Sequence, residues 1–246
     1  QWGDNYHGSN ILSGRTPSYA MIKLQLDPAE WFSFTYHHGW LVSEVIDSAR
    51  SYYSEPERYR AVFRPKYIAA NVFTFRPWKK LNFSVGNSVV YSDDNVQPAY
   101  LIPFMFFKSI DHTLTHGIDN QNSQMFLNIS SRQIKHLHLF TSVYIDEFSI
   151  SRIGDARRHN FASIKIGGSL AGWPFNNLTL RCEYTRSSPI TYQHRVETLT
   201  FATNDYNLGH YLRDNSQEIY ASLSWRPIAD LYASITFTLA EHGNNY

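Results

Sequence analysis

The histidine pair whose spacing most resembles a metal site is His112 and His116, four residues apart, with Asp111 and Asp119 close by. On a helix this spacing would place both imidazoles on one face, where they could hold Zn²⁺. The glutamate of a His-Glu-x-x-His motif is missing, however, and Gly117 indicates a loop. A solvated loop is therefore the favoured interpretation, and we predict no metal site and no cofactor.

Hydrolytic chemistry has no local motif in this chain, since the Gly-x-Ser-x-Gly turn of many hydrolases is absent. A site assembled from strand faces would leave no such motif, so a hydrolase stays open as an alternative. A glycosidase needs two carboxylates about 5–10 Å apart, whereas the strand face that carries Arg181 has only Glu183. The adjacent His37 and His38 would point to opposite faces of a strand. We predict no catalytic residue.

Aromatic and planar polar side chains gather in the segments 1–10, 50–60 and 190–211. Aromatic faces combined with a few placed hydrogen-bonding groups are what a sugar-binding surface requires. Each side chain alone is more often an ordinary loop residue, so the prediction depends on their concentration. The candidate glycan-binding residues are Trp2, Tyr6, Tyr192, His194, Arg195 and His210.

Composition narrows the class of protein. The 246 residues have net charge +1, 16% aromatic and only 17% charged residues, where about 25% charged is usual for a soluble globular protein. The near-neutral net charge gives no electrostatic reason to expect binding to nucleic acid, so we predict no nucleic-acid partner. The single cysteine, Cys182, excludes an internal disulfide and any multi-cysteine metal site, and the strand pattern places it on an apolar face.

Apolar and polar residues alternate with period two along most of the chain, which predicts β-strands. The pattern is clearest at 81–91, 178–185, 219–226 and 231–239 and weaker at 18–26, 32–43, 66–76, 124–131, 136–146 and 160–171. Many of these runs approach the 9–11 residues with which a tilted strand crosses a bilayer. A mean hydropathy of −0.38 is compatible with such a barrel, because its strands alternate faces.

The connections between these strands alternate strictly between short and long. Short turns are predicted at 27–30, 77–79, 132–135, 174–177 and 227–230, and long connections at 44–65, 92–123, 147–159 and 188–216. This asymmetry is typical of outer-membrane barrels, with turns in the periplasm and loops outside. Four tryptophans adjoin the short turns, as an aromatic belt at one interface would require: Trp31, Trp78, Trp173 and Trp225.

The polar face of the strands carries Lys165, Arg181, Glu183 and Arg226, which we expect to form a polar network in the lumen. A soluble β-sandwich would expose the same face to solvent. The alternation of short turns and long loops favours a barrel over a sandwich. We therefore predict an all-β, antiparallel transmembrane outer-membrane barrel, with ten to eleven strands in residues 1–246. The strand near 231–241 ends on the long-loop side, so we expect strands to be lacking at both ends.

A family resemblance is carried by segments in collinear order over nearly the whole chain. They run from Trp2 to Ser13, from Val85 to Tyr91 with Tyr100 to Pro103 following, and from Leu180 through Tyr192 to His210. Together they resemble the Wzi-type capsule assembly proteins, especially the Bacteroidota versions, which include gliding-motility relatives of the RemB kind. One departure is Asn87, where many members are expected to have an acidic residue that would help to organise the lumen.

The resemblance implies an outer-membrane barrel of a Gram-negative bacterium that binds capsular or surface polysaccharide without catalysis. The implied partners are this polysaccharide, outer-membrane lipid and other envelope proteins. Two alternatives stay open: a structural or partner-binding barrel in an envelope, motility or secretion complex, and a barrel-embedded hydrolase.

Overall fold

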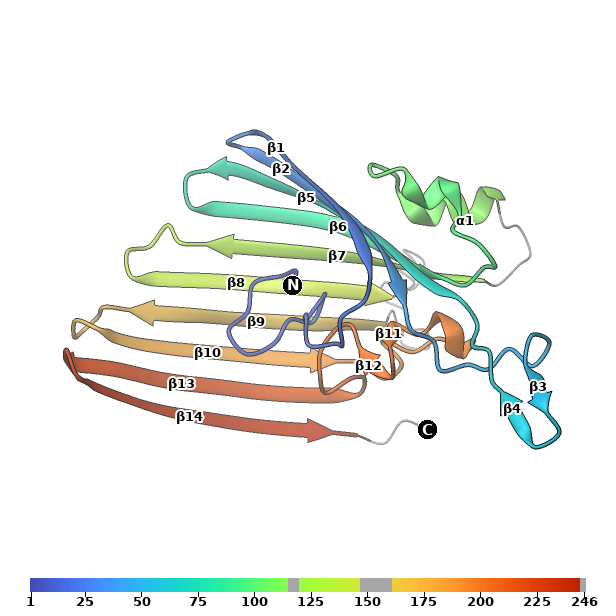
Figure 1. The fold of residues 1–246 in the computed structure, drawn as a ribbon. Coiled ribbons are helices and arrows are strands. Elements are labelled where there is room, and N and C mark those ends of the chain that lie inside the picture. Colours follow the sequence, from blue (N-terminus) through green and yellow to red (C-terminus); the bar gives the residue numbers. More distant parts are fainter. Residues whose placement is uncertain (115–119, 147–160, 244–246) are drawn as a thin grey trace, which may run out of the picture.

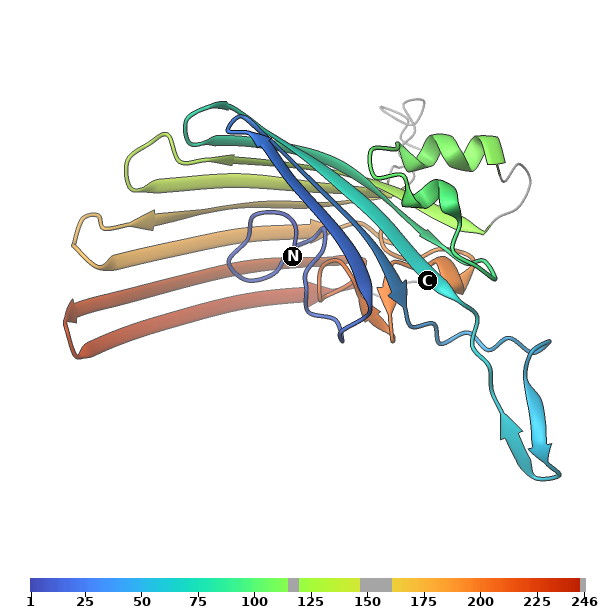
Figure 2. The ribbon, with the colours of Figure 1, turned by 45° about the horizontal axis from the view of Figure 1, so that its top comes forward.

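The computed structural model describes residues 1–114, 120–146 and 161–243 (Figure 1). Its main element is a ten-stranded antiparallel sheet with strictly neighbouring connections. In spatial order the strands are β1 (Met21–Ala29), β2 (Phe32–Leu41), β5 (Lys66–Trp78), β6 (Leu81–Tyr91), β7 (Gln121–Ser131), β8 (Leu137–Asp146), β9 (Phe161–Ala171), β10 (Leu178–Ser187), β13 (Ser216–Ile228) and β14 (Leu231–His242). The edge strands β1 and β14 do not pair with each other, so the sheet is an open, curved wall (Figure 2).

Smaller elements lie in the long connections. The hairpin of β3 (Tyr52–Glu55) and β4 (Arg58–Arg60) extends away from the wall (Figures 1 and 2). The other elements are η1 (Pro98–Leu101), α1 (Phe107–Leu114), η3 (Glu197–Leu199), β11 (Ala202–Thr203) and β12 (Tyr206–Asn207). In the described part of the chain, no helix is long and apolar enough to span a membrane.

The five hairpin turns of the ten-stranded sheet lie at one end of the wall, and the long connections lie at the other (Figure 1). The four tryptophans predicted to form a belt are exposed at the turn end, as expected. Three turns fall later than predicted, at 30–31, 79–80 and 229–230, because strand pairing continues through bulges that contain Pro28, Pro77 and Pro227. Proline is tolerated there because a bulge leaves one residue out of the hydrogen-bond ladder.

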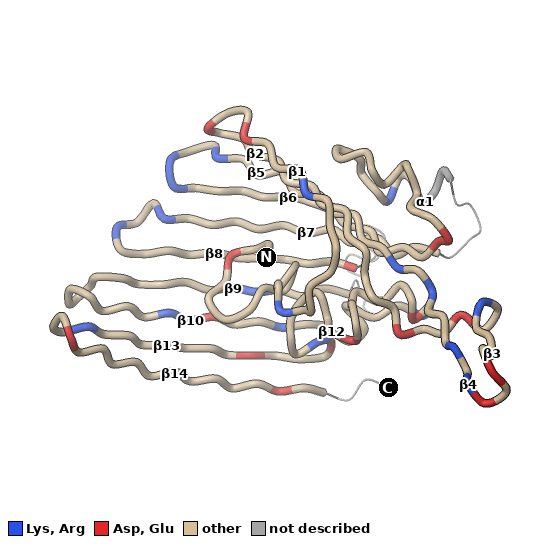
Figure 3. Tube along the Cα trace, in the orientation of Figure 1, with Lys and Arg blue, Asp and Glu red and all other residues tan. Residues whose placement is uncertain are grey.

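Alternation along the strands separates an inner face, on which the N-terminal segment lies, from an outer face. On β10, Arg181 and Glu183 face inward and are largely covered, whereas Leu180, Cys182 and Tyr184 are exposed on the outer face. This confirms the predicted face assignment for the strand. Between the turns and the long connections, the strands have few charged residues (Figure 3).

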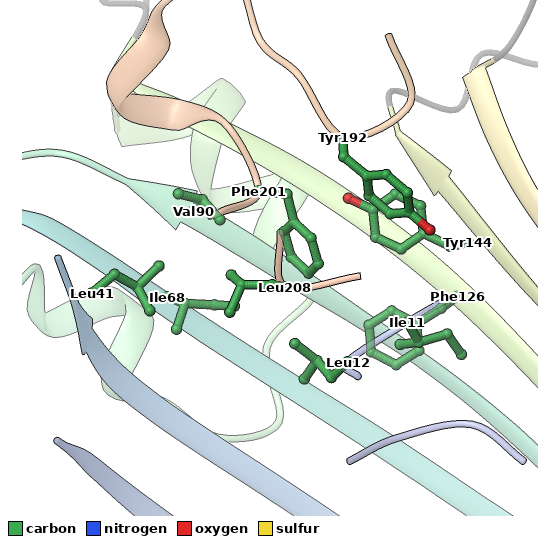
Figure 4. Close-up of a cluster of buried hydrophobic side chains, with 10 residues drawn as sticks. All are labelled: Ile11, Leu12, Leu41, Ile68, Val90, Phe126, Tyr144, Tyr192, Phe201 and Leu208. Atoms are coloured by element: carbon green, nitrogen blue, oxygen red, sulfur yellow. The ribbon is translucent and has the colours of Figure 1, made fainter. Parts of the chain in front are cut away.

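The inner face is covered near its centre by two irregular segments of the chain. Ile11 and Leu12 come from the N-terminal segment, and Tyr192, Phe201 and Leu208 come from the long connection after β10 (Figure 4). They pack against side chains of the wall to form one buried cluster, completed by Leu41, Ile68, Val90, Phe126 and Tyr144. The cluster therefore holds both segments inside the curve of the sheet.

A second buried cluster lies on the outer face. Here Tyr100, Phe107 and Ile110, from η1 and α1, pack on Phe34, Tyr36, Tyr67, Ala69, Val89 and Tyr91 of β2, β5 and β6. Asn87 belongs to this face, because it pairs directly with Asn71 and donates to its side-chain oxygen at 2.7 Å. Position 87 therefore has no part in a lumen network in this chain, because the parity of β6 directs this side chain outward.

Candidate functional site

The N-terminal segment is anchored to the inner face by hydrogen bonds to distant strands. The Asn10 amide donates to the carbonyl oxygens of Ser142 at 3.2 Å and Ser163 at 2.9 Å. The backbone N–H of Ser13 donates to the carbonyl oxygen of Leu208 at 2.8 Å, which joins the two inner segments. The side-chain NH₂ group of Asn10 and the backbone N–H of Ser13 thus find partners without a strand ladder.

A buried ion pair holds the first part of this segment. Lys165 Nζ lies 2.9 Å from Glu183 Oε2, and both side chains are fully buried. The Glu183 carboxylate also accepts the backbone N–H groups of Tyr6 and His7. These extra hydrogen bonds offset part of the cost of taking two charges out of water. The pair therefore connects β9, β10 and the N-terminal segment.

The other two predicted network residues have different surroundings. The Arg181 guanidinium lies 5.1 Å from the centre of the Tyr6 ring, a cation–π contact. Arg226 is exposed near the β13–β14 turn, where its Nε donates to the carbonyl oxygen of Ala229 at 2.9 Å. The structure thus brings Lys165, Glu183 and Arg181 together around one segment but leaves Arg226 apart.

A second polar cluster surrounds Glu218 on β13. Its carboxylate lies 3.6 Å from His210 Nε2 and 3.7 Å from His7 Nε2, and it accepts the hydroxyl of Tyr211. Burial lowers the pKa of His210, although the nearby carboxylate opposes this shift. Burial also raises the pKa of the Tyr211 hydroxyl, and its hydrogen bond to Glu218 adds to the shift. This cluster fastens the connection after β10 to the wall.

The six predicted glycan-binding residues do not form one surface. Tyr192 is 2% exposed and its hydroxyl donates to the carbonyl oxygen of Asn10 at 2.7 Å, and His210 is 1% exposed. His194 is half-buried and Arg195 is exposed, both in the connection that includes η3. Trp2 and Tyr6 lie half-buried on the inner face. Two of the six are therefore structural side chains, because loop aromatics fold into the curve of the wall.

Trp2 lies between two clefts on the inner face. One cleft of about 310 Å³, here the turn-side cleft, is lined by Trp2, Asp4 and Phe126 together with the polar side chains of Thr35, Thr74, Ser84 and Asn128. The other, of about 380 Å³, is here the edge cleft and is lined by Trp2, Tyr19, Lys23 and His37 among others. The Trp2 ring packs edge-on against His37, with centroids 4.9 Å apart, and against Phe126 at 5.6 Å.

The polar groups of the turn-side cleft are held in place by one another. Asn128 Nδ2 donates to the Asp4 carboxylate at 2.7 Å, and Asn128 Oδ1 accepts the backbone N–H of Asp4 at 3.1 Å. Thr74 and Ser84 are joined by a hydroxyl hydrogen bond of 2.9 Å. The sequence analysis did not predict Thr74, Ser84 and Asn128 as site residues. The one feature in the sequence that could have indicated them is their position on the polar face of their strands.

A third cleft, of about 390 Å³, lies where the long-loop ends of β10, β13 and β14 meet. No Phe, Tyr or Trp lines it, so it lacks the aromatic face that a sugar ring would stack on. As for metals, the described residues contain no group of three or more His, Cys, Asp or Glu side chains that could hold a metal ion. His116 and Asp119 lie outside the described residues, and so do the side chains of Asp111 and His112.

His37 and His38 face opposite sides of β2, as predicted: His37 contacts Trp2, and His38 Nε2 lies 2.8 Å from the Tyr91 hydroxyl.

Comparison with known proteins finds a similarity of fold to one solved structure. No family model matches the chain, and no curated protein matches it. Among solved structures it is similar to Wzi, described as an outer membrane protein involved in group 1 capsule assembly in Escherichia coli and a carbohydrate-binding β-barrel. The TM-score is 0.64 at 12% identity, over 98% of this chain and 52% of that one. The chain thus spans about half the length of the Wzi structure, and at this identity the likeness shows the fold: an all-β, antiparallel fold like that of the Wzi β-barrel, as predicted.

Proposed function

We propose that this protein binds surface or capsular polysaccharide at the outer membrane of a Gram-negative bacterium and does not transform it. The observation that carries the proposal is the position of Trp2 between two clefts with polar walls. The fold likeness to a carbohydrate-binding barrel supports it. The motif resemblance supports the finer proposal of a Wzi-type capsule assembly protein of the Bacteroidota kind.

The turn-side cleft has the composition that sugar recognition requires. Apolar C–H faces of a sugar ring pack on an aromatic ring, and its hydroxyls need donors and acceptors at fixed positions. Trp2 and Phe126 provide the rings, while Thr74, Ser84 and Asn128 provide hydrogen-bonding groups from three strands. Its volume of about 310 Å³ is at the lower end of small-ligand sites, about 300–1,000 Å³, which suits a short stretch of a glycan chain.

The same cleft supports binding without cleavage. Glycosidases use two carboxyl groups on either side of the scissile bond, whereas Asp4 is the one carboxylate that lines this cleft. Asp4 is also occupied by its hydrogen bond to Asn128. Because a carboxylate has further lone pairs beyond the one that Asn128 uses, we assign Asp4 to accepting hydrogen bonds from sugar hydroxyls, with Asn128 holding it in position.

Replacing Trp2 by alanine tests the proposal. An aromatic contact contributes about 0.5–1.5 kcal/mol beyond its buried area, so we expect Trp2→Ala to weaken glycan binding by about 2- to 13-fold or more. Affinity would be measured by calorimetry with capsular oligosaccharides that a glycan array selects. The matched control is Tyr53→Ala, since Tyr53 is an exposed aromatic residue of the remote β3–β4 hairpin.

Loss of affinity in the Tyr53 variant with full affinity in the Trp2 variant would move binding to the hairpin and contradict the assigned site. Failure of the unaltered protein to bind any glycan would favour the partner-binding scaffold of an envelope complex instead. Stable, stoichiometric co-purification of other envelope proteins would then be the expected finding.

A further inference from the structure

The connection between β6 and β7 runs along the outer face of the wall, where α1 lies outside the sheet (Figures 1 and 2). We call residues 98–110 of this connection the wall segment. Its inward side chains, Tyr100, Phe107 and Ile110, are buried against β2, β5 and β6. Phe104 stacks on Phe34, with ring centroids 4.4 Å apart. The segment therefore covers strand surface that would otherwise be the outside of a barrel.

Polar side chains of the strands satisfy the irregular backbone of the wall segment. Asn71 Nδ2 donates to the carbonyl oxygens of Pro103 at 2.9 Å and Met105 at 2.8 Å. Asn87 Oδ1 accepts the backbone N–H of Phe107 at 2.9 Å. The hydroxyl of Tyr36 donates to the carbonyl oxygen of Tyr100 at 2.8 Å. Irregular backbone is tolerated at membrane depth only where its polar groups find such partners.

The height of these contacts along the strands can be placed relative to the tryptophan belt. Asn71 lies seven residues before Trp78 on β5. With a rise of about 3.3 Å per residue and a tilt of about 40°, this is roughly 18 Å from the belt. Phe73, the neighbour of Phe34 across β2 and β5, lies at roughly 13 Å on the same reasoning. Both heights fall within an apolar band about 25 Å tall, in the half nearer the long connections.

From Leu101 through Phe106 the exposed side chains of the wall segment are apolar, while Lys108 and Ser109 follow in α1. Leu101 is 43% exposed, Ile102 48%, Phe104 57% and Phe106 43%. The chain has no charged residue from Asn95 through Phe107. Facing water, this group would be an exposed apolar patch; facing lipid, it continues the exposed outer side chains of the neighbouring strands, such as Ile22 and Leu26 of β1.

We propose that residues 98–107 of the wall segment are immersed in the acyl chains of the membrane leaflet nearer the long connections. Asn71 and Asn87 anchor it, which explains why two amides occupy outward positions on the adjacent strands β5 and β6. Leu101, Ile102, Phe104 and Phe106 form its lipid-binding surface. The inference depends on the membrane setting of the proposed function, though not on glycan binding.

Quenching by lipid tests the proposal with the protein reconstituted in vesicles. Cys182 is the single cysteine and is exposed on the outer face of β10, so a fluorophore on it reports the strand face. In a Cys182→Ser background, Phe104→Cys and, separately, Leu101→Cys report the wall segment, and Tyr53→Cys reports the β3–β4 hairpin. The vesicles are phosphatidylcholine with acyl chains brominated near their middle. We expect several-fold quenching of the labels at 182, 104 and 101, and none at 53.

Two results would overturn the inference and can be told apart. Quenching at 182 without quenching at 104 and 101 would place the wall segment outside lipid, against water or a protein partner, and leave the membrane setting intact. Absence of quenching at 182 as well would remove the membrane setting on which the proposed function also depends. Two labelled positions on the segment keep the test valid if one substitution prevents folding.

Discussion

At the scale of single residues, the buried Lys165–Glu183 pair is the contact whose removal we expect to destabilise the folded protein most. Removing one partner of a buried ion pair leaves an uncompensated charge and costs about 3–5 kcal/mol. We expect Lys165→Met to lower the free energy of unfolding by about this amount, measured by urea titration of the reconstituted protein. The double variant Lys165→Met, Glu183→Leu should recover most of it, since no lone charge remains. Equal stability of the single variant and the unaltered protein would contradict the assigned pair.

His210 gives the inner segments a predicted dependence on pH. Burial lowers its pKa below the ordinary 6.5, so the unfolded chain binds more protons than the folded one between the two pKa values. Stability is therefore fully present above about pH 6.5 and is lost as pH falls below it. Glu218, His7 and Tyr211 face the same imidazole.

We expect Tm to fall between pH 7.5 and pH 5.5, and to fall less in His210→Gln, which carries no titrating group at this position. An unchanged slope in that variant would assign the pH dependence to other residues.

At the scale of elements, Gly86 controls how closely β5, β6 and the ring of Phe126 approach. A Cβ atom there would lie 2.2 Å from the carbonyl oxygen of Asn71 and 2.3 Å from the Phe126 ring. We expect Gly86→Ala to destabilise the protein by about 1–3 kcal/mol or more through overpacking, seen as a lower urea midpoint. Gly8→Ala is the matched control, since its Cβ would meet nothing closer than 3.5 Å. Equal effects of the two substitutions would show that space at Gly86 is not limiting.

The strands could be predicted and the inner segments could not, for a physical reason. A strand leaves a period-two signal in its own residues, and four of the five turns of the sheet adjoin a proline, which a local pattern reveals. The site depends instead on contacts between residues far apart, such as Asp4 with Asn128 and Tyr6 with Glu183. Nothing local distinguishes Tyr192, which folds inward, from Tyr53, which stays exposed.

At the scale of the whole molecule, the wall separates three surroundings. The turn end is marked by four exposed tryptophans, the outer face of the strands carries many exposed apolar side chains, and the inner face holds the polar clefts. This division is what a barrel wall between lipid and a polar lumen requires. In the membrane setting of the proposed function, the two sheet edges, β1 and β14, would be the costliest part of the wall, because unpaired backbone groups in lipid cost several kcal/mol each.

We therefore expect the outer edge of β14 to be hydrogen-bonded in the membrane, by further strands or by a second copy. Adjacent residues of a strand direct their N–H groups to opposite sides, so of Thr236 and Phe237 one points toward β13 and the other toward the edge. Proline removes the N–H and is tolerated only where that group is not needed for the ladder. Thr236→Pro and Phe237→Pro, made separately in the full protein, should each lower the urea midpoint if both sides of β14 are paired. Tolerance of either one would show that the edge is free, and the wall would then have to meet something other than lipid along β14.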